Sequence, residues 1–93
     1  MTWIRTIPLP EADEALRSAL DAQRALYPSE YAVPVMPTAD GVSGIVASHS
    51  LIPEALHHAF ATFGVLMSPD LPLTRRQHEM NTTRVSVLNR CHY

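Results

Sequence analysis

Two residues near the end of the chain, Glu79 and Cys91, have side chains suited to acid–base and thiol chemistry. Thr74 and Gln77 have the spacing of a capping box, in which each residue satisfies a backbone N–H of the other, so the sequence predicts a helix that begins there. The twelve residues from Glu79 to Cys91 would span about 18 Å of a regular helix. We therefore expect the carboxylate and the thiol on one helix, although helix geometry alone does not bring them into contact.

Cys91 is the single cysteine among the 93 residues, so these residues cannot close an intramolecular disulfide. Three interpretations follow: a reduced structural thiol, half of a longer motif, or a crosslinking site between two chains. Two histidines flank the residues of interest, His78 beside Glu79 and His92 beside Cys91. Because imidazole gains or loses a proton near neutral pH, proton transfer belongs to the chemistry to be considered.

The five histidines raise the question of a metal site, and their spacing argues against one. His57 and His58 are adjacent and would point about 100° apart on a helix. Glu54 and His58 would share a helical face, but two ligands fall short of the usual three or four. The sequence has no H-E-x-x-H pattern and no paired cysteines. We expect neither a metal nor another cofactor.

The composition is that of an ordinary soluble globular domain, with 46% hydrophobic and 17% charged residues. No run approaches the roughly 18 apolar residues of a membrane span, and the first ten residues lack the pattern of a signal peptide. We therefore expect a cytoplasmic protein without membrane contact. The net charge is −2 and the seven basic residues, all arginine, form no basic stripe, so nucleic acid is not an expected partner.

The first half of the chain is predicted to supply an arm, one long helix and a loop. Residues 1–10 combine a few apolar residues with two prolines, which is typical of an extended arm, and Trp3 is expected to be its packing anchor. A helix is predicted from Pro10 to just before Pro28, because acidic residues fill its first turn and apolar residues recur every three to four positions. Residues 28–41 contain three prolines and are expected to form an irregular connection.

The second half is predicted to contain three helices. A short helix is expected over residues 42–48, and a longer one from Pro53, where an apolar stripe continues to Met67. Gly64 lies beside this stripe and would let another helix approach closely. With the helix after Thr74, the sequence predicts an all-α fold, a small bundle of about four helices with an extended N-terminal arm, as one domain over residues 1–93.

The C-terminal part contains L-T-R-R-Q-H-E-M and V-S-V-L-N-R-C-H-Y, preceded by S-H-S-L-I-P-E-A-L-H-H-A-F-A-T-F-G-V-L-M. These stretches resemble the alkylhydroperoxidase-like family, also called the carboxymuconolactone decarboxylase family, and particularly its peroxidase-related members. Such proteins are all-helical, usually oligomeric, and carry a glutamate, a C-x-x-C motif and then a histidine. The resemblance implies thiolate attack on a peroxide and closure of a disulfide by the second thiol, with glutamate and histidine relaying protons.

By this resemblance, Glu79 matches the relay glutamate and Cys91 the first cysteine of C-x-x-C, usually the resolving thiol, so both would be vestigial catalytic residues. The second cysteine would fall at position 94, beyond Tyr93. We therefore expect a truncated alkylhydroperoxidase-like domain without efficient peroxidase turnover, because the attacking thiol is missing. The alternative is a natural peroxidase-related thiol oxidoreductase represented by a fragment.

The polar segment N-T-T-R at residues 81–84 departs from the family pattern. Family helices are apolar here and support oligomer packing, so this polarity favours an exposed surface. We expect a non-catalytic scaffold, truncated or engineered, that binds a protein partner, for example as an enzyme inhibitor, or that associates with itself. The expected binding surface consists of six residues from this helix and the long loop: Asn81, Thr82, Arg84, Tyr31, Val35 and Met36.

Overall fold

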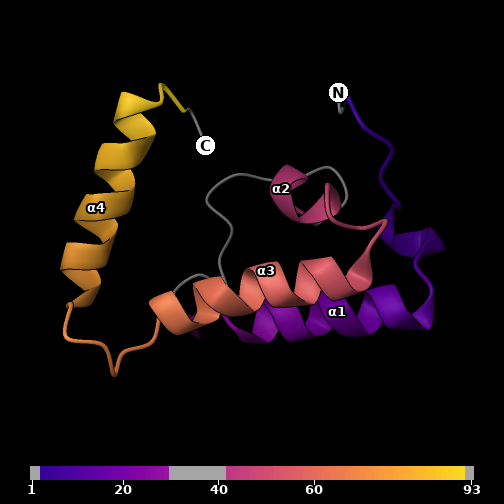
Figure 1. Cartoon of the computed structure of the whole chain (residues 1–93), viewed down its shortest axis with the longest axis horizontal. Helices are drawn as coiled ribbons and strands as arrows, with labels where there is room; N and C mark the ends of the chain where they lie inside the picture. The colour runs from indigo at the N-terminus through magenta and orange to yellow at the C-terminus, as the bar shows by residue number, and fades with distance from the viewer. Residues whose placement is uncertain (1–2, 30–41, 92–93) are drawn as a thin grey trace.

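The computed structural model describes residues 3–29 and 42–91, which form helices joined by turns and loops, with no strand among them. The elements are η1 (Leu9–Glu11, a 3-10 turn), α1 (Glu14–Ala25), α2 (Gly44–Ala47), α3 (Pro53–Leu66) and α4 (Arg75–Leu88). Figure 1 shows the N-terminal arm leading into η1. The predicted all-helical fold of about four helices with an extended arm is confirmed.

Helix α1 begins later than the sequence predicted. Pro10 lies in the 3-10 turn η1, and the backbone at Ala12 is extended, so the helix begins at Glu14 rather than at Pro10. The reason is the cap: the Asp13 side chain accepts a hydrogen bond from the Leu16 N–H at 2.8 Å, which is the preferred role of aspartate before a first turn. The end of α1 at Ala25, before Pro28, agrees with the prediction.

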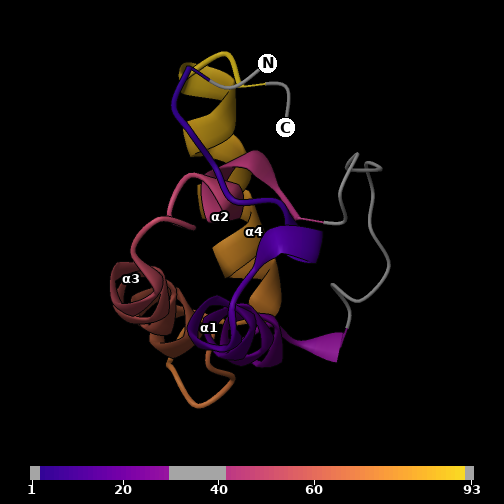
Figure 2. The same ribbon diagram turned by 90° about the vertical axis from the view of Figure 1, so that its right-hand side faces the viewer.

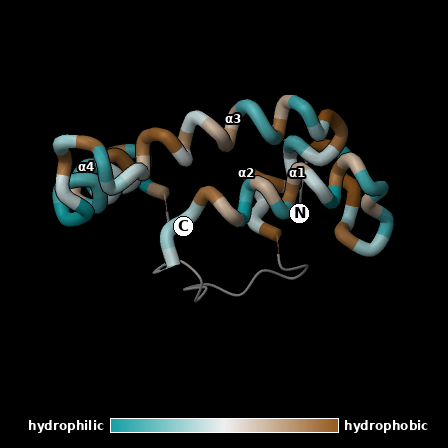
Figure 3. Tube along the Cα trace, turned by 90° about the horizontal axis from the view of Figure 1, so that it is seen from below, coloured by the Kyte–Doolittle hydropathy of each residue, from teal (hydrophilic) through white to brown (hydrophobic). Residues whose placement is uncertain are grey.

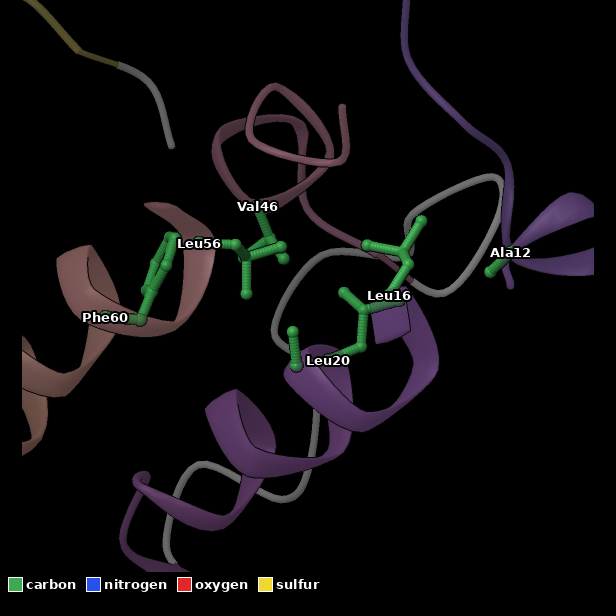
Figure 4. Packing of buried hydrophobic residues seen from close by; sticks show 7 residues of the cluster. Ala12, Leu16, Leu20, Val46, Leu56 and Phe60 are labelled. Atoms are coloured by element: carbon green, nitrogen blue, oxygen red, sulfur yellow. The ribbon is translucent and has the colours of Figure 1, made fainter. Parts of the chain in front are cut away.

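The core lies between α1, α2 and α3 (Figure 4). Leu16 of α1 and Leu56 of α3 are the largest fully buried side chains, and Leu20, Val46 and Phe60 complete the contact between the three helices. Helices α1 and α3 lie side by side and run in the same direction (Figures 1 and 2). The core is therefore one helix pair, closed on one side by the short α2.

Gly64 sets the distance between α1 and α3 at their C-terminal ends. A Cβ atom added to Gly64 would lie 2.7 Å from a methyl carbon of Leu26, which caps α1. No real Cβ tolerates that contact without a shift, so only glycine lets Leu26 sit against α3 here. The predicted role of Gly64 in close helix approach is confirmed.

The N-terminal arm is fixed at Ile7 and not at Trp3. The Ile7 N–H donates to the buried Ser50 hydroxyl at 2.8 Å, and the side chains of Ile7 and Leu9 pack against the core. Trp3 is fully exposed, so its predicted role as packing anchor is wrong. The Ser50 hydrogen bond and the η1 turn lead the chain directly into α1 and leave residues 3–4 outside the core.

Two further helix predictions differ in extent from the structure. Helix α2 covers only Gly44–Ala47, shorter than the predicted 42–48. Helix α3 begins at Pro53 as predicted. Its apolar stripe, however, is buried only at Leu56 and Phe60, while Phe63 and Leu66 are 48% and 53% exposed. Among the helices of residues 3–29 and 42–91, none packs over the second half of the stripe.

Helix α4 stands apart from the other three (Figure 1). Its predicted capping box is present: the Gln77 N–H donates to the Thr74 hydroxyl at 3.3 Å and the Thr74 N–H donates to the Gln77 side chain at 2.8 Å. No residue of α4 is buried. Among the described residues, no helix has the length and apolar character needed to cross a bilayer.

Candidate functional site

The end of α4 places Cys91 outside the helix. The helix stops at Leu88, and the Arg90 backbone takes a left-handed conformation with φ of 52°. The Arg90 N–H donates to Val87 O at 3.1 Å and the Cys91 N–H donates to Ser86 O at 2.9 Å, the two bonds of a Schellman cap. The expectation that Glu79 and Cys91 share one helix is wrong, because this cap ends the helix three residues before Cys91.

The structure does not assemble Glu79 and Cys91 into a thiol site. Both residues are exposed, and the helix rises about 14 Å from Glu79 to Leu88 before the chain reaches Cys91. His78 adjoins Glu79 in sequence but points to a different side of α4. Its Nε2 atom is buried without a hydrogen-bond partner in the described part of the chain. His92, the other predicted proton carrier, lies outside the described residues.

The predicted binding residues of α4 are exposed but do not form one patch. Asn81, Thr82 and Arg84 all face solvent. Thr82 and Arg84 are two positions apart, so they lie on nearly opposite sides of the helix. The Thr82 hydroxyl donates to Glu79 O at 3.1 Å and is engaged with its own helix. The loop residues Tyr31, Val35 and Met36 lie outside the described residues.

One face of α4 instead carries a stripe of apolar and polar side chains that is open to solvent. Met80 and Val87, which are 54% and 60% exposed, supply its apolar surface. The stripe, called the α4 stripe below, consists of Arg76, Glu79, Met80, Thr83, Arg84 and Val87. Arg84 is exposed there, which agrees with the low cost of an arginine that stays in water.

The predicted binding surface did not include Arg76, Thr83 and Val87. The signal was the spacing of residues 76, 80, 83 and 87, which alternates four and three positions and marks one side of a helix. The predicted binding residues of this helix, Asn81, Thr82 and Arg84, come instead from the polar segment at residues 81–84. Of the predicted binding residues, only Arg84 belongs to the α4 stripe.

Two of the histidines, His49 and His58, make contacts within their own part of the fold. The His49 Nδ1 atom lies 2.8 Å from Ile45 O and 3.1 Å from the Ser48 hydroxyl, and its ring packs edge-on against Phe60 at 5.6 Å. On the exposed side of α3, the His58 Nε2 atom lies 4.0 Å from Glu54 Oε1. The described residues contain no group of three or more potential metal ligands.

No family model, no curated protein and no solved structure matches this chain. The resemblance to the alkylhydroperoxidase-like family therefore stays a prediction.

Proposed function

We propose that the chain is a helical protein-binding module whose α4 stripe is the contact surface. The observation that carries the proposal is the state of α4: a complete helix with an N-terminal capping box and a C-terminal Schellman cap, and no buried residue. Large apolar side chains are exposed along it, namely Met80, Val85, Val87 and Leu88.

The physical argument is that α4 lacks the packing that normally stabilises a helix of its length. It has fourteen residues, and helices this short are marginal in water without tertiary packing of an apolar face. Capping supplies only about 0.5–2 kcal/mol at each such site. A partner seated on Met80 and Val87 would supply the missing burial, at about 25 cal/mol for each Å² of apolar surface covered.

The charges beside the stripe support a protein partner in particular. Arg76, Glu79 and Arg84 border Met80 and Val87, so an apolar strip lies between groups of both signs. Protein interfaces commonly combine an apolar centre with a polar and charged rim. Catalysis has weaker support, because Glu79 and Cys91 are separated and each is open to solvent.

The proposal is tested by capture followed by measurement with purified components. The chain and its Met80→Ser/Val87→Ser variant are immobilised, and any captured protein is identified, purified and titrated against both. We expect the variant to bind at least about tenfold more weakly, since loss of two buried anchors commonly costs more than about 1.4 kcal/mol.

Trp3→Ser is the matched control, because it removes an exposed apolar side chain from the N-terminal arm and leaves α4 unchanged. It should bind as the unmodified chain does. Partners that bind the Met80→Ser/Val87→Ser variant with unchanged affinity, or a chain that captures nothing at all, would contradict the proposal.

A further inference from the structure

We infer that the partner of the α4 stripe is an acidic amphipathic helix of another protein, with carboxylates spaced to pair with Arg76 and Arg84 on either side of Met80. This inference rests on the proposed function and names the chemistry of the partner for the same stripe. The charge of the α4 region, the unpaired state of the two arginines and their spacing around an apolar residue lead to this partner.

The region that contains α4 is basic, whereas the rest of the chain is acidic. Residues 74–91 contain four arginines and one acidic residue, Glu79, and therefore have a formal charge of +3. Since the net charge of the chain is −2, the remaining residues together have a formal charge of −5. Complementary charge speeds the encounter with a partner of opposite sign and orients it. An acidic protein is therefore attracted to the α4 region, while the rest of the chain adds no attraction for it.

Arg76 and Arg84 are not paired with any acid in the described part of the chain. Both side chains are exposed, and neither forms an ion pair within residues 3–29 and 42–91. Glu79 lies on the same stripe, three positions after Arg76, but is not within ion-pair distance of it. A guanidinium group can take a carboxylate through two parallel hydrogen bonds. The two arginines are therefore available to pair with carboxylates of a partner.

The two arginines flank Met80 at equal spacing. Met80 follows Arg76 by four residues and precedes Arg84 by four residues, so both arginine side chains neighbour the Met80 side chain on the helix surface. The eight residues from Arg76 to Arg84 span about 12 Å of helix. A partner helix matches this separation with two Asp or Glu residues about seven or eight positions apart and an apolar residue between them. The apolar residue would pack on Met80 while the carboxylates meet the arginines.

The spacing along the stripe favours a helix as the partner segment. Residues 76, 80, 83 and 87 alternate four and three positions, which is the spacing of a seam along which two helices pack side by side. Met80 and Val87 lie one heptad apart on this seam and are both more than half exposed. Figure 3 shows hydrophobic and hydrophilic residues interspersed along α4. This pattern is typical of a helix that pairs through a narrow apolar seam with charged edges.

Two other occupants fit α4 less well. Helices that lie in a membrane surface have a broad apolar face with Trp, Phe or Leu, whereas α4 has no Trp, Phe or Tyr and carries Glu79 on its stripe. A second α4 would bring one region of charge +3 against another, and like charges across an interface weaken association. An acidic helix of another protein supplies both the opposite charge and the missing burial.

The test is a selection from a displayed library of amphipathic helices against the immobilised chain. The apolar positions of the library are leucine, and the flanking positions are randomised equally among Glu, Gln and Lys. Helices that bind the chain but not its Met80→Ser/Val87→Ser variant are sequenced. We expect Glu to be enriched at flanking positions about seven or eight residues apart.

The selection separates this inference from the proposed function. Enrichment of Gln or Lys at the flanking positions would overturn the acidic partner and leave the protein-binding proposal standing. A selection that yields no helix dependent on Met80 and Val87 would contradict both.

Charge-changing variants then measure the contribution of each sign. Arg76→Gln/Arg84→Gln should bind a selected helix about tenfold more weakly at about 50 mM salt, because each lost ion pair has a several-fold effect. Glu79→Gln should bind it about two- to threefold more tightly, since a repulsive charge is removed. Arg5→Gln/Arg24→Gln is the matched control: it removes two positive charges outside α4 and should bind within about twofold of the unmodified chain. Equal binding by all three variants would overturn the inference.

Two readouts show that lost binding reports lost charge. Circular dichroism of Arg76→Gln/Arg84→Gln should match that of the unmodified chain, because glutamine and arginine have similar helix propensities. Raising the salt to about 500 mM should remove most of the difference between this variant and the chain, because salt screens exposed charges. A difference that persists at high salt would contradict a charge pairing.

Two measurements on the chain alone test the other occupants. Sedimentation at the concentrations of the binding assay should give a mass of 10.3 kDa, and vesicles containing phosphatidylserine should not carry the chain into the pellet. A dimer that is lost in Met80→Ser/Val87→Ser would make a second copy the occupant and overturn the inference. Vesicle binding that is lost in Arg76→Gln/Arg84→Gln would overturn it in favour of an anionic membrane.

Discussion

Helices α3 and α4 have the same length, fourteen residues, but differ in how much of their surface is buried. Helix α3 buries Leu56 and Phe60 against α1, whereas no residue of α4 is buried. Helix α3 has apolar residues at successive contact positions and a glycine where Leu26 approaches. Helix α4 interrupts its stripe with Arg76, Thr83 and Arg84. Local signals are enough to start a helix, but an uninterrupted apolar stripe with room for a neighbour is needed to bury it.

The largest difference between the two helices should come from truncating one side chain on each. Leu56 is fully buried, so Leu56→Ala leaves a cavity and should cost about 2–5 kcal/mol of unfolding free energy. Met80→Ala removes a side chain that is 54% exposed and should change that free energy by less than about 0.5 kcal/mol. Urea unfolding of dilute protein compares them. Equal losses would mean that α4 packs into the core.

Gly64→Ala should have the next largest effect. The new methyl group would lie 2.7 Å from Leu26, and overpacking of this kind costs about 1–3 kcal/mol. The better helix propensity of alanine offsets up to about 1 kcal/mol of this cost, so we expect the free energy of unfolding to fall by about 1 kcal/mol. Gly44→Ala is the control, since nothing lies within 4 Å of its added Cβ. If thermal unfolding shows Gly64→Ala to be as stable as Gly44→Ala, the close approach of α1 and α3 is not what stabilises the pair.

Arg90→Gly should stabilise the end of α4 without affecting the core. Arg90 has φ of 52°, a conformation that glycine adopts freely and other residues adopt at a cost. The gain should be about 0.5–1 kcal/mol, seen as slower amide exchange at positions 90 and 91, whose N–H groups form the cap. The urea midpoint of the core should stay unchanged. Faster exchange at these amides would argue against the Schellman cap.

Cys91→Ser should have no effect on peroxide chemistry. Cys91 lies beyond the helix that carries Glu79, and both side chains are exposed, so Glu79 is not placed to activate the thiol. Consumption of a hydroperoxide with excess dithiol should be equally slow for the chain and for the variant. Many turnovers that disappear in both Cys91→Ser and Glu79→Gln would restore the peroxidase interpretation.

The sequence predicted those features that depend on a few neighbouring residues. The Thr74–Gln77 capping box and the Pro53 start of α3 are formed as predicted. Gly64 was recognised because its lack of a side chain has one structural use on an apolar helix face. The start of α1 was misplaced because Pro10 and Asp13 both suit a first turn, and the Asp13 cap determines the outcome.

Features that depend on distant contacts were not predictable in the same way. Trp3 is large and apolar, yet it is exposed. The arm attaches instead where the Ile7 N–H donates a hydrogen bond to the hydroxyl of Ser50, 43 positions away. The end of α4 was missed because Arg90 stands where a Schellman cap usually has glycine. Whether α4 packs on its own α3 depends on the direction of the connection between them, which no local pattern in residues 67–74 specifies.

The most direct test of the central claim, that α4 is a binding surface left uncovered in the single chain, is amide hydrogen exchange measured helix by helix in dilute protein. At about 5 µM, α4 should exchange far faster than the buried turns of α1 and α3, since its hydrogen bonds open without disrupting the core. Protection of α4 equal to that of α3 in this dilute sample would contradict the account.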